Sequence, residues 1–308
     1  MGGTDYAKEG IVHIENLVKR YGSLVALDHL NLGPNGSGKT TAINCMLALL
    51  KYDKGSIRIF GKEMEPDNYE AKRQIGIVQQ NVAVFDEFTV YENIDYFCGL
   101  YINDRKKRKQ LVEEAIAFVG LEDYRKIRPK KLSGGLLRRL NIACGIAHKP
   151  RLIILDEPTV AVDPQSRNRI LEGIQELNRQ GSTIIYTSHY MEEVEQICTR
   201  IAIMDHGRSI AAGTKEQLTG MIKTGEKVTV EAVVLKEEQL VQIRELAHVF
   251  KVEYENDILR VQCTEAKHNL VRILRYLEDR EISFGRVYSE LPTLNDVFLE
   301  ITGKELRD

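Results

Sequence analysis

The clearest hydrophobic pattern in this chain is an uninterrupted apolar run at residues 152–155, Leu-Ile-Ile-Leu. A strand that is apolar at every position is typical of a parallel sheet whose two faces are both covered by helices. The segment Thr-Ile-Ile-Tyr-Thr at residues 183–187 also predicts a strand. The pattern therefore predicts an α/β domain built on a central parallel sheet.

The last third of the chain predicts a second kind of fold. Strands are expected at residues 228–232, 249–254, 258–263 and 282–288, and helices at residues 237–246 and 268–277. The order strand, helix, strand, strand, helix, strand is that of a split βαβ or ferredoxin-like unit. Because 308 residues suffice for two domains, we expect a first domain at residues 1–220 and a ferredoxin-like α+β domain at residues 221–308.

A glycine-rich segment at residues 33–40, GPNGSGKT, matches the phosphate-binding pattern G-x-x-x-x-G-K-[ST] at every position. Its glycines let backbone N–H groups surround a β-phosphate, while the lysine supplies a charge for the β- and γ-phosphates and the threonine a hydroxyl for Mg²⁺. This Walker A motif alone leaves a wide choice of nucleotide-binding families. The predicted phosphate-binding residues are Gly33, Asn35, Gly36, Ser37, Gly38, Lys39, Thr40 and Thr41.

A second predicted anion site is the Leu-Ser-Gly-Gly turn at residues 132–135. Ser133 can cap the helix expected to begin near Leu136. The free N–H groups at a helix start, together with the helix dipole, attract an anion. We therefore expect Ser133, Gly134 and Gly135 to face a phosphate.

Two acids, Asp156 and Glu157, follow directly after the apolar run at residues 152–155. Ligands of open α/β sheets bind beyond the carboxyl ends of the strands. Asp156 is thus placed to hold Mg²⁺ through water, and Glu157 to polarise an attacking water. The same acids, followed by Pro158, would also suit the start of a helix, and this segment alone leaves both interpretations open.

These motifs, in this order, resemble the ATP-binding cassette (ABC) family of ATPases, and the resemblance covers nearly the whole chain. It implies that Tyr21 stacks on adenine, although an ordinary strand-end tyrosine is the alternative. It implies that Gln80 senses Mg²⁺ and the attacking water, and that Asp163 lies in a loop that crosses between partner subunits. His189 matches the histidine that contacts the γ-phosphate; a lone strand-end histidine is more often structural, but its position after the acidic strand favours the functional role.

The chain departs from the family pattern at three points near these residues. Gln79 stands where the family often has proline, Ala161-Val162 replaces the usual Gly-Leu before Asp163, and Leu136 stands where glutamine is frequent. The last change affects the hydrogen bonding of that side chain and leaves Ser133 and Gly135 in place.

The resemblance implies a P-loop ABC cassette with an antiparallel N-terminal sheet and a helical subdomain inserted near residues 89–133, followed by the ferredoxin-like domain. The segment at residues 292–299, PTLNDVFL, is similar to the tail of daunorubicin-resistance-type ATPases of ABC-2 exporters. The implied catalytic residues are Glu157, His189 and Gln80, and the implied metal-binding residues are Thr40, Gln80 and Asp156.

The resemblance also implies an activity and partners. We expect Mg²⁺-dependent ATP hydrolysis by a head-to-tail homodimer that closes on ATP and energises a multi-span membrane permease, exporting a drug, lipid or similar hydrophobic substrate. The alternative is a non-hydrolysing regulatory or assembly subunit, which an assay of phosphate release would distinguish.

Composition favours a cytoplasmic protein attached to the inner face of the membrane through the permease, without direct membrane insertion. No apolar stretch approaches the roughly eighteen residues that span a bilayer. The start of the chain is neither a signal peptide nor a myristoylation site, because Tyr6 replaces the required Ser or Thr. The five cysteines are odd in number, widely spaced and free of C-x-x-C pairs, which indicates reduced thiols and no zinc or iron–sulfur site.

A dense basic run, Arg-Lys-Lys-Arg-Lys at residues 105–109, contrasts with a net charge of −2. Nucleic-acid binding is one interpretation, but no aromatic residues alternate with these charges, so we expect no nucleic-acid partner. A solvated helix face and a surface that contacts the permease both remain possible.

One segment conflicts with the rest of the sequence. Only eleven residues, 22–32, separate Tyr21 from the Walker A motif, and by comparison with the family they are short by roughly a dozen residues, at about 3.3 Å each one strand plus a turn. Residues 30–32 alternate and Asp28 and His29 are polar, so residues 26–32 resemble a half-exposed strand and not the central one. Either the natural protein has residues here that this sequence lacks, or this is a true deletion variant in which residues 26–32 move into the central position.

Overall fold

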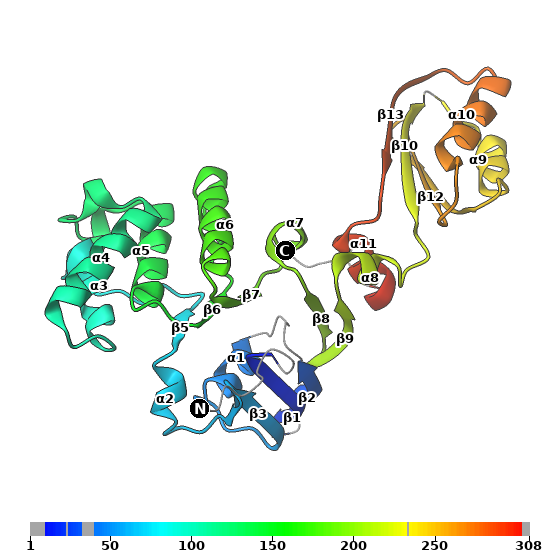
Figure 1. The fold of residues 1–308 in the computed structure, drawn as a ribbon. Helices are drawn as coiled ribbons and strands as arrows, with labels where there is room; N and C mark the ends of the chain where they lie inside the picture. The colour runs from blue at the N-terminus through cyan, green and yellow to red at the C-terminus, as the bar shows by residue number, and fades with distance from the viewer. Residues whose placement is uncertain (1–9, 23, 33–39, 233, 304–308) are drawn as a thin grey trace. The chain divides into compact units, whose positions relative to one another are not determined.

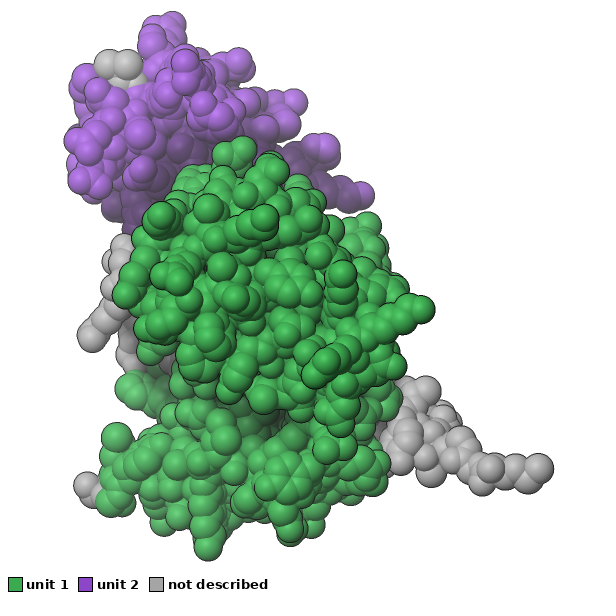
Figure 2. Space-filling model, turned by 90° about the vertical axis from the view of Figure 1, so that its left-hand side faces the viewer, with its two compact units in different colours: residues 1–212 green, residues 213–308 purple. Residues whose placement is uncertain are grey.

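The computed structural model describes residues 10–22, 24–32, 40–232 and 234–303 (Figure 1). The chain forms two compact units, Met1–Ala212 and Gly213–Asp308, coloured green and purple in Figure 2. The predicted domain boundary at residue 220 stays a prediction.

The first unit begins with an antiparallel sheet in the order β2-β1-β3-β4. Its strands are β1 (Val12–Tyr21), β2 (Leu24–Leu32), β3 (Lys54–Ile59) and β4 (Lys62–Glu63). Buried Leu17, Leu30 and Ile57 pack in one core with Ile43 and Met46 of helix α1 (Thr40–Met46). This arrangement brings the start of α1 toward the parallel sheet, because the same core contains Leu152 and Ile154 from that sheet.

The parallel sheet consists of β5 (Ile75–Val78), β6 (Leu152–Asp156) and β7 (Thr183–Thr187), in that order. Strand β6 is buried at all five positions, as its apolar sequence predicts. Helices α6 (Pro164–Arg179) and α7 (Met191–Ile197) follow β6 and β7, and the short helix α2 (Tyr69–Lys72) precedes β5. The carboxyl ends of β6 and β7 therefore meet at one edge of the sheet.

Between β5 and β6 the chain forms a cluster of helices, which lie together in Figure 1. They are α3 (Val90–Gly99), α4 (Arg105–Val119), α5 (Gly134–Ile146) and the short 3₁₀ turns η1 (Glu122–Tyr124) and η2 (Pro129–Lys131). Local signals fix their ends: Thr89 and Glu92 form a capping box, and Gly120 ends α4 in the left-handed conformation. The first unit ends with the hairpin β8 (Ile201–Asp205) and β9 (Arg208–Gly213).

The second unit has the predicted ferredoxin-like order of strands and helices. After α8 (Lys215–Thr219) come β10 (Glu226–Ala232), α9 (Glu237–Arg244), β11 (Val249–Glu255), β12 (Ile258–Cys263), α10 (Asn269–Asp279), β13 (Phe284–Glu290) and α11 (Leu294–Thr302). The antiparallel sheet has the order β11-β12-β10-β13. Buried Leu240, Ile243, Ile273 and Leu277 pack α9 and α10 against this sheet. The predicted fold class, an ABC-type α/β cassette with an antiparallel sheet and inserted helices plus this domain, is confirmed.

Strand β2 occupies the position expected of a half-exposed strand. It lies at the edge of the antiparallel sheet, where Leu32 pairs with Ile14 and Leu24 pairs with Tyr21. The backbone N–H of Asp28 donates to the Gly207 carbonyl at 3.0 Å. The hypothesis that residues 26–32 move into the central parallel sheet is therefore wrong, because their hydrogen bonds already go to β1 and to the β8–β9 turn.

The parallel sheet stops at β7 in the part of the chain that the structure describes, and β8 belongs to a separate two-stranded sheet. Yet the first four residues of β8 are all buried. The first residues of β7 and β8, together with α6 and α7, line a hollow of about 400 Å³. A buried apolar strand is typical of a sheet interior and not of a sheet edge. Among the described residues, no strand pairs with β7 on the side away from β6, in keeping with the short spacing before the Walker A motif.

Among the described residues, no helix combines the length and the apolar character needed to cross a bilayer. The five cysteines are unpaired, and four of them are buried. Burial raises the pKa of the Cys98 thiol to about 11, so this thiol stays protonated near neutral pH.

Candidate functional site

Asp156 lies at the carboxyl end of β6 and is the best-connected acid of the site. Its carboxylate accepts hydrogen bonds from the Thr40 hydroxyl at 2.7 Å and from the Thr187 hydroxyl at 2.6 Å. The side chain is only 5% exposed. Three segments that are far apart in sequence, the start of α1 and the ends of β6 and β7, therefore converge on one carboxylate.

Glu157 lies beside it and contacts two other predicted residues. Its carboxylate accepts a hydrogen bond from Gln80 Nε2 at 2.9 Å, and its Oε1 is 3.5 Å from His189 Nδ1. Its backbone has a φ of 48°, in the left-handed region that non-glycine residues rarely adopt and that often marks functional sites. The Glu157 and His189 side chains are 29% and 39% exposed, so water can reach the carboxylate.

The backbone around Gln80 is held in place by hydrogen bonds from helix α5. The buried guanidinium of Arg138, from α5, donates to the Gln79 carbonyl at 3.0 Å and to the Gln80 carbonyl at 2.7 Å. Asn141, one turn further along α5, accepts a hydrogen bond from the backbone N–H of Ala83 at 3.1 Å. The helix that begins at the Leu-Ser-Gly-Gly turn is thus bonded directly to the segment that carries Gln80.

The Leu-Ser-Gly-Gly turn itself forms a second group with Asp163. The Ser133 hydroxyl caps α5 by accepting from the Leu136 N–H at 3.3 Å. Asp163 caps α6 by accepting from the Ser166 N–H at 2.9 Å, and this backbone hydrogen bond lowers the pKa of the Asp163 carboxyl. A Cβ at Gly135 would lie 2.5 Å from the Ser166 hydroxyl and 2.9 Å from the Asp163 carboxylate, so only glycine fits between the two loops.

The remaining predicted residues are placed as follows. Gly33 to Lys39 lie outside the described residues, and with them Asn35, Gly36, Ser37 and Gly38. Thr41 is the second residue of α1. Tyr21 ends β1, is 49% exposed, and has the Lys19 ammonium 5.0 Å from its ring centroid. Its ring is therefore accessible for stacking, and the role of Tyr21 stays a prediction.

The donors around Asp156 fit a magnesium ion. Mg²⁺ prefers a few protein oxygens and completes its shell with water and substrate phosphates. The Thr40 hydroxyl and the Asp156 carboxylate are within hydrogen-bond distance of each other, so both can face one ion. No group of three or more His, Cys, Asp and Glu side chains in the described residues could hold a metal by itself. The arrangement suits an ion that arrives with a nucleotide.

Two residues of the site escape prediction from the sequence. Thr187 bonds Asp156 and accepts the Glu157 N–H at 3.0 Å; its position at the end of β7, opposite Asp156, is the signal that could have identified it. Arg138 has no such signal, because an arginine on a helix is usually exposed.

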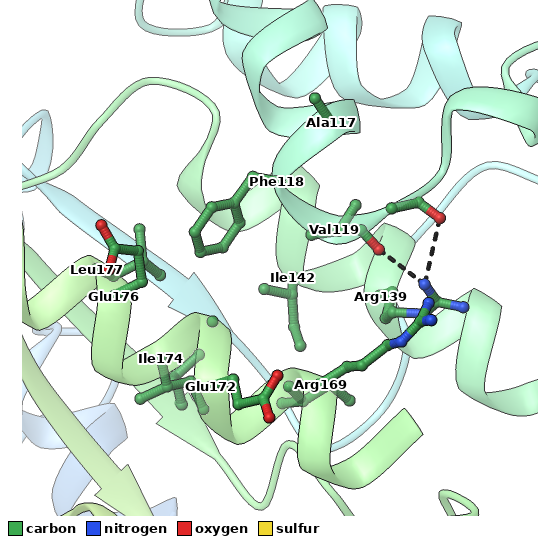
Figure 3. Close-up of a pocket in the computed structure, with 14 residues that line it drawn as sticks. Ala117, Phe118, Val119, Arg139, Ile142, Arg169, Glu172, Ile174, Glu176 and Leu177 are labelled. Atoms are coloured by element: carbon green, nitrogen blue, oxygen red, sulfur yellow. Dashed lines mark hydrogen bonds between the residues drawn. The ribbon is translucent and has the colours of Figure 1, made fainter. Parts of the chain in front are cut away.

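The largely apolar hollow in Figure 3 lies elsewhere, between α4, α5 and α6. Its volume is about 370 Å³, and at one end Arg139 Nη1 donates to the carbonyls of Val119 and Gly120 at 2.9 and 3.2 Å. None of the predicted site residues lines it.

Comparison with known sequences gives consistent matches. A family described as ABC transporter matches residues 20–160. The linearmycin resistance ATP-binding protein LnrL of Bacillus subtilis is 37% identical over 97% of this chain and 100% of its own length. The daunorubicin resistance ATP-binding protein DrrA3 of Streptomyces coeruleorubidus is 31% identical over 96% of this chain and 97% of its own length. The Nod factor export ATP-binding protein I of Ralstonia nicotianae is 32% identical, with coverages of 97% and 95%.

The match to LnrL also includes a difference in length between the two chains. It extends over 311 residues but covers 97% of this 308-residue chain, so the relative has roughly a dozen residues where this chain has none. That length agrees with one strand and a turn.

Solved structures match the fold. The ATP-binding subunit of an ABC transporter gives a TM-score of 0.62 at 21% identity and covers 68% of this chain and 92% of that protein. A dimeric bacterial ABC transporter cassette gives 0.60 at 24% identity, with coverages of 66% and 98%.

Proposed function

This chain belongs to the ABC transporter family, and on that premise we propose that it binds and hydrolyses ATP to drive a membrane exporter. The observation that carries the proposal is the convergence of six side chains at the carboxyl ends of β6 and β7. Thr40, Asp156 and Thr187 form one hydrogen-bonded group, and Gln80, Glu157 and His189 form an adjacent one.

Glu157 is the proposed general base. Its carboxylate lies between an amide donor and an imidazole, and it is accessible to water. It would take a proton from the water that attacks the γ-phosphate, while Gln80 orients that water and His189 contacts the γ-phosphate. Lys39 and the backbone of the Walker A motif would bind the β- and γ-phosphates, and Tyr21 would stack on adenine.

Magnesium would be held by Thr40 and Asp156, with Gln80 nearby. When bound, the ion supplies charge neutralisation between the β- and γ-phosphates. The buried Asp156 carboxylate would hold the ion from the protein side, and its hydrogen bond from Thr187 keeps it oriented.

The second group, Ser133, Gly134, Gly135 and Asp163, is proposed to act on the partner's nucleotide in a head-to-tail homodimer. Ser133 begins a 13-residue helix whose first N–H groups can bind a phosphate. Gly135 touches the Asp163 loop, so the two elements would meet the partner as one surface. One solved cassette of this fold is described as dimeric, which supports this arrangement.

A membrane permease is the proposed partner, and an aromatic patch is the surface it would contact. The patch consists of Phe85, Phe88, Tyr96 and Phe97, whose neighbouring rings lie 5.0–5.9 Å apart. Phe85 and Tyr96 are 40% and 44% exposed, which is unusual for large apolar side chains unless a partner covers them.

The aromatic patch is connected to the Gln80–Glu157 contact by hydrogen bonds and by a short stretch of chain. Asn93 accepts the Phe85 N–H at 2.8 Å and donates to the Phe85 carbonyl at 3.0 Å. Phe85 follows Gln80 by five residues, and Arg138 fixes the backbone of that segment. A cytoplasmic segment of the permease that moves the patch would therefore move Gln80 relative to Glu157. The basic run begins α4, where Arg108 Nε donates to the Asp95 carboxylate at 2.8 Å. Both interpretations of this run, a solvated helix face and a surface that contacts the permease, stay open.

The substrate class follows from the relatives. Their names refer to linearmycin resistance, daunorubicin resistance and Nod factor export. We therefore propose export of an amphipathic or hydrophobic compound, with this subunit attached to the inner face of the membrane through the permease.

The test is phosphate release by the purified protein and by Glu157→Gln. The substitution keeps the size and the hydrogen bond to Gln80 but removes the base, so turnover should fall by about 10²-fold or more while calorimetric ATP binding persists. Glu172→Gln, at an exposed position of α6, is the matched control and should be unchanged. Undiminished phosphate release by Glu157→Gln would remove it from this role. Tight ATP binding without phosphate release by the wild type would favour the non-hydrolysing subunit.

A further inference from the structure

A buried carboxylate next to the site belongs to none of the motifs above. Glu193, in the first turn of α7, is only 3% exposed. Its Oε2 accepts hydrogen bonds from the hydroxyls of Tyr186 at 2.6 Å, Thr159 at 2.8 Å and Ser188 at 2.9 Å. Three hydroxyl donors on one oxygen are best accommodated by an ionised carboxylate, which only accepts.

The three hydroxyls come from segments that carry the predicted chemistry. Thr159 follows Glu157 by two residues, and Ser188 directly precedes His189. Tyr186 lies in β7, one residue before Thr187. The carboxylate of Glu193 therefore ties the loop after β6 to the loop after β7, close to the point where Glu157 and His189 meet.

The other oxygen of Glu193 faces a third segment. Its Oε1 is 3.4 Å from Arg167 Nε, and the backbone N–H of Arg167 donates to the backbone carbonyl of Asp163 at 2.9 Å. The Arg167 guanidinium lies 4.7 Å from the centroid of the Tyr190 ring, which in turn is 4.2 Å from the His189 ring. Contacts made by Arg167 thus connect the start of α6 with Glu193 and, through the Tyr190 ring, with His189.

We propose that Glu193 is a positioning residue that holds the loops of Glu157, His189 and Asp163 in one arrangement and so sets the geometry between the base and the histidine. It would act through these residues and not on the nucleotide. Its effect on turnover rests on the proposed function, whereas its effect on the environment of His189 does not.

The test compares Glu193→Gln with Glu192→Gln, an exposed neighbour on the same helix. The first readout is the NMR signal of the His189 imidazole, assigned with His189→Ala. Glu193→Gln should shift that signal, and Glu192→Gln should leave it unchanged. An unaltered His189 signal in a folded Glu193→Gln protein would overturn the proposal. If Glu193→Gln does not fold, Ser188→Ala is tested in its place, because it removes one of the three hydrogen bonds that Glu193 accepts.

The second readout is phosphate release in two backgrounds. Glu193→Gln should lower kcat about tenfold with little change in KM for ATP, as expected when a charge-assisted network is weakened. In a His189→Ala background the same substitution should change kcat by less than about twofold, because the effects of substitutions at coupled residues are not additive. Equal losses in both backgrounds would mean a merely structural role and would overturn the proposal. If the wild type releases no phosphate, the proposed function fails and the His189 signal still decides this inference.

Discussion

Replacement of Arg138 by methionine should lower both stability and turnover, because Arg138 connects α5 to the backbone of the Gln80 segment. The guanidinium is 6% exposed and makes two charge-assisted hydrogen bonds, to the Gln79 and Gln80 carbonyls. Methionine has a similar length and no donor, so it removes both bonds without leaving a large cavity.

The size of the effect follows from these two bonds. A hydrogen bond to a charged group contributes about 1.5–3 kcal/mol, which gives about 3–6 kcal/mol for the pair. Gln79 and Gln80 are exposed residues, so water can replace part of the lost bonding. We therefore expect a loss of about 2–4 kcal/mol in the free energy of unfolding. Because the Gln80 backbone loses its anchor, kcat should also fall, by about tenfold or more.

The neighbouring arginine offers a matched control. Arg139 is also buried and its Nη1 also contacts two backbone carbonyls, those of Val119 and Gly120, at the end of α4. Arg139→Met should therefore lower stability to a similar extent in urea unfolding, yet leave kcat for phosphate release within about twofold of the wild type. The reasoning would be refuted if the two variants lost turnover equally, or if Arg138→Met kept full turnover.

Three further predictions concern the nucleotide. The first compares the 308-residue chain with a variant that carries about a dozen extra residues, one apolar strand and a turn, between Leu32 and Gly33. In calorimetric titration the 308-residue chain should bind Mg·ATP more weakly than this variant. Equal affinities would show that ATP binding does not need a strand next to β7. Mixing Lys39→Ala protein with Ser133→Arg protein should restore part of the phosphate release, since one composite site of the mixed dimer is intact, and no recovery with mixed dimers demonstrated would count against action in trans. Gly135→Ala should lower turnover more than ATP affinity, because its Cβ would displace Ser166 and the Asp163 loop; turnover equal to that of the wild type would argue against close packing of the two loops.

Much of the fold follows from local sequence. Residues 152–155 are apolar throughout and form a fully buried parallel strand, since a strand covered on both faces has no solvent-facing position. In the last third of the chain, strand and helical patterns alternate in an order that has one common solution, and the structure adopts it. The motifs around Thr40, Ser133 and Asp156 can also be recognised from the sequence, because phosphate binding needs particular residues at fixed spacing.

Tertiary structure alone decides which of these residues meet. The contact between Thr40 and Asp156 joins positions 116 residues apart, and it exists because α1 and β6 pack in one hydrophobic core. Arg138 and Glu193 carry no signal in the sequence, since an arginine or a glutamate on an amphipathic helix is usually solvated. They become buried and bonded only when separate loops are brought around them.

The segment before the Walker A motif separates the two kinds of information most clearly. The sequence determines that residues 26–32 are half-polar and that the connection is short. Only the structure decides that they remain at the edge of the antiparallel sheet, paired with β1, while the position beside β7 is left without a described strand. The physical reason is that moving β2 would break its ladder with β1 and bury Asp28 away from Arg208, whose Nε donates to its carboxylate at 2.6 Å.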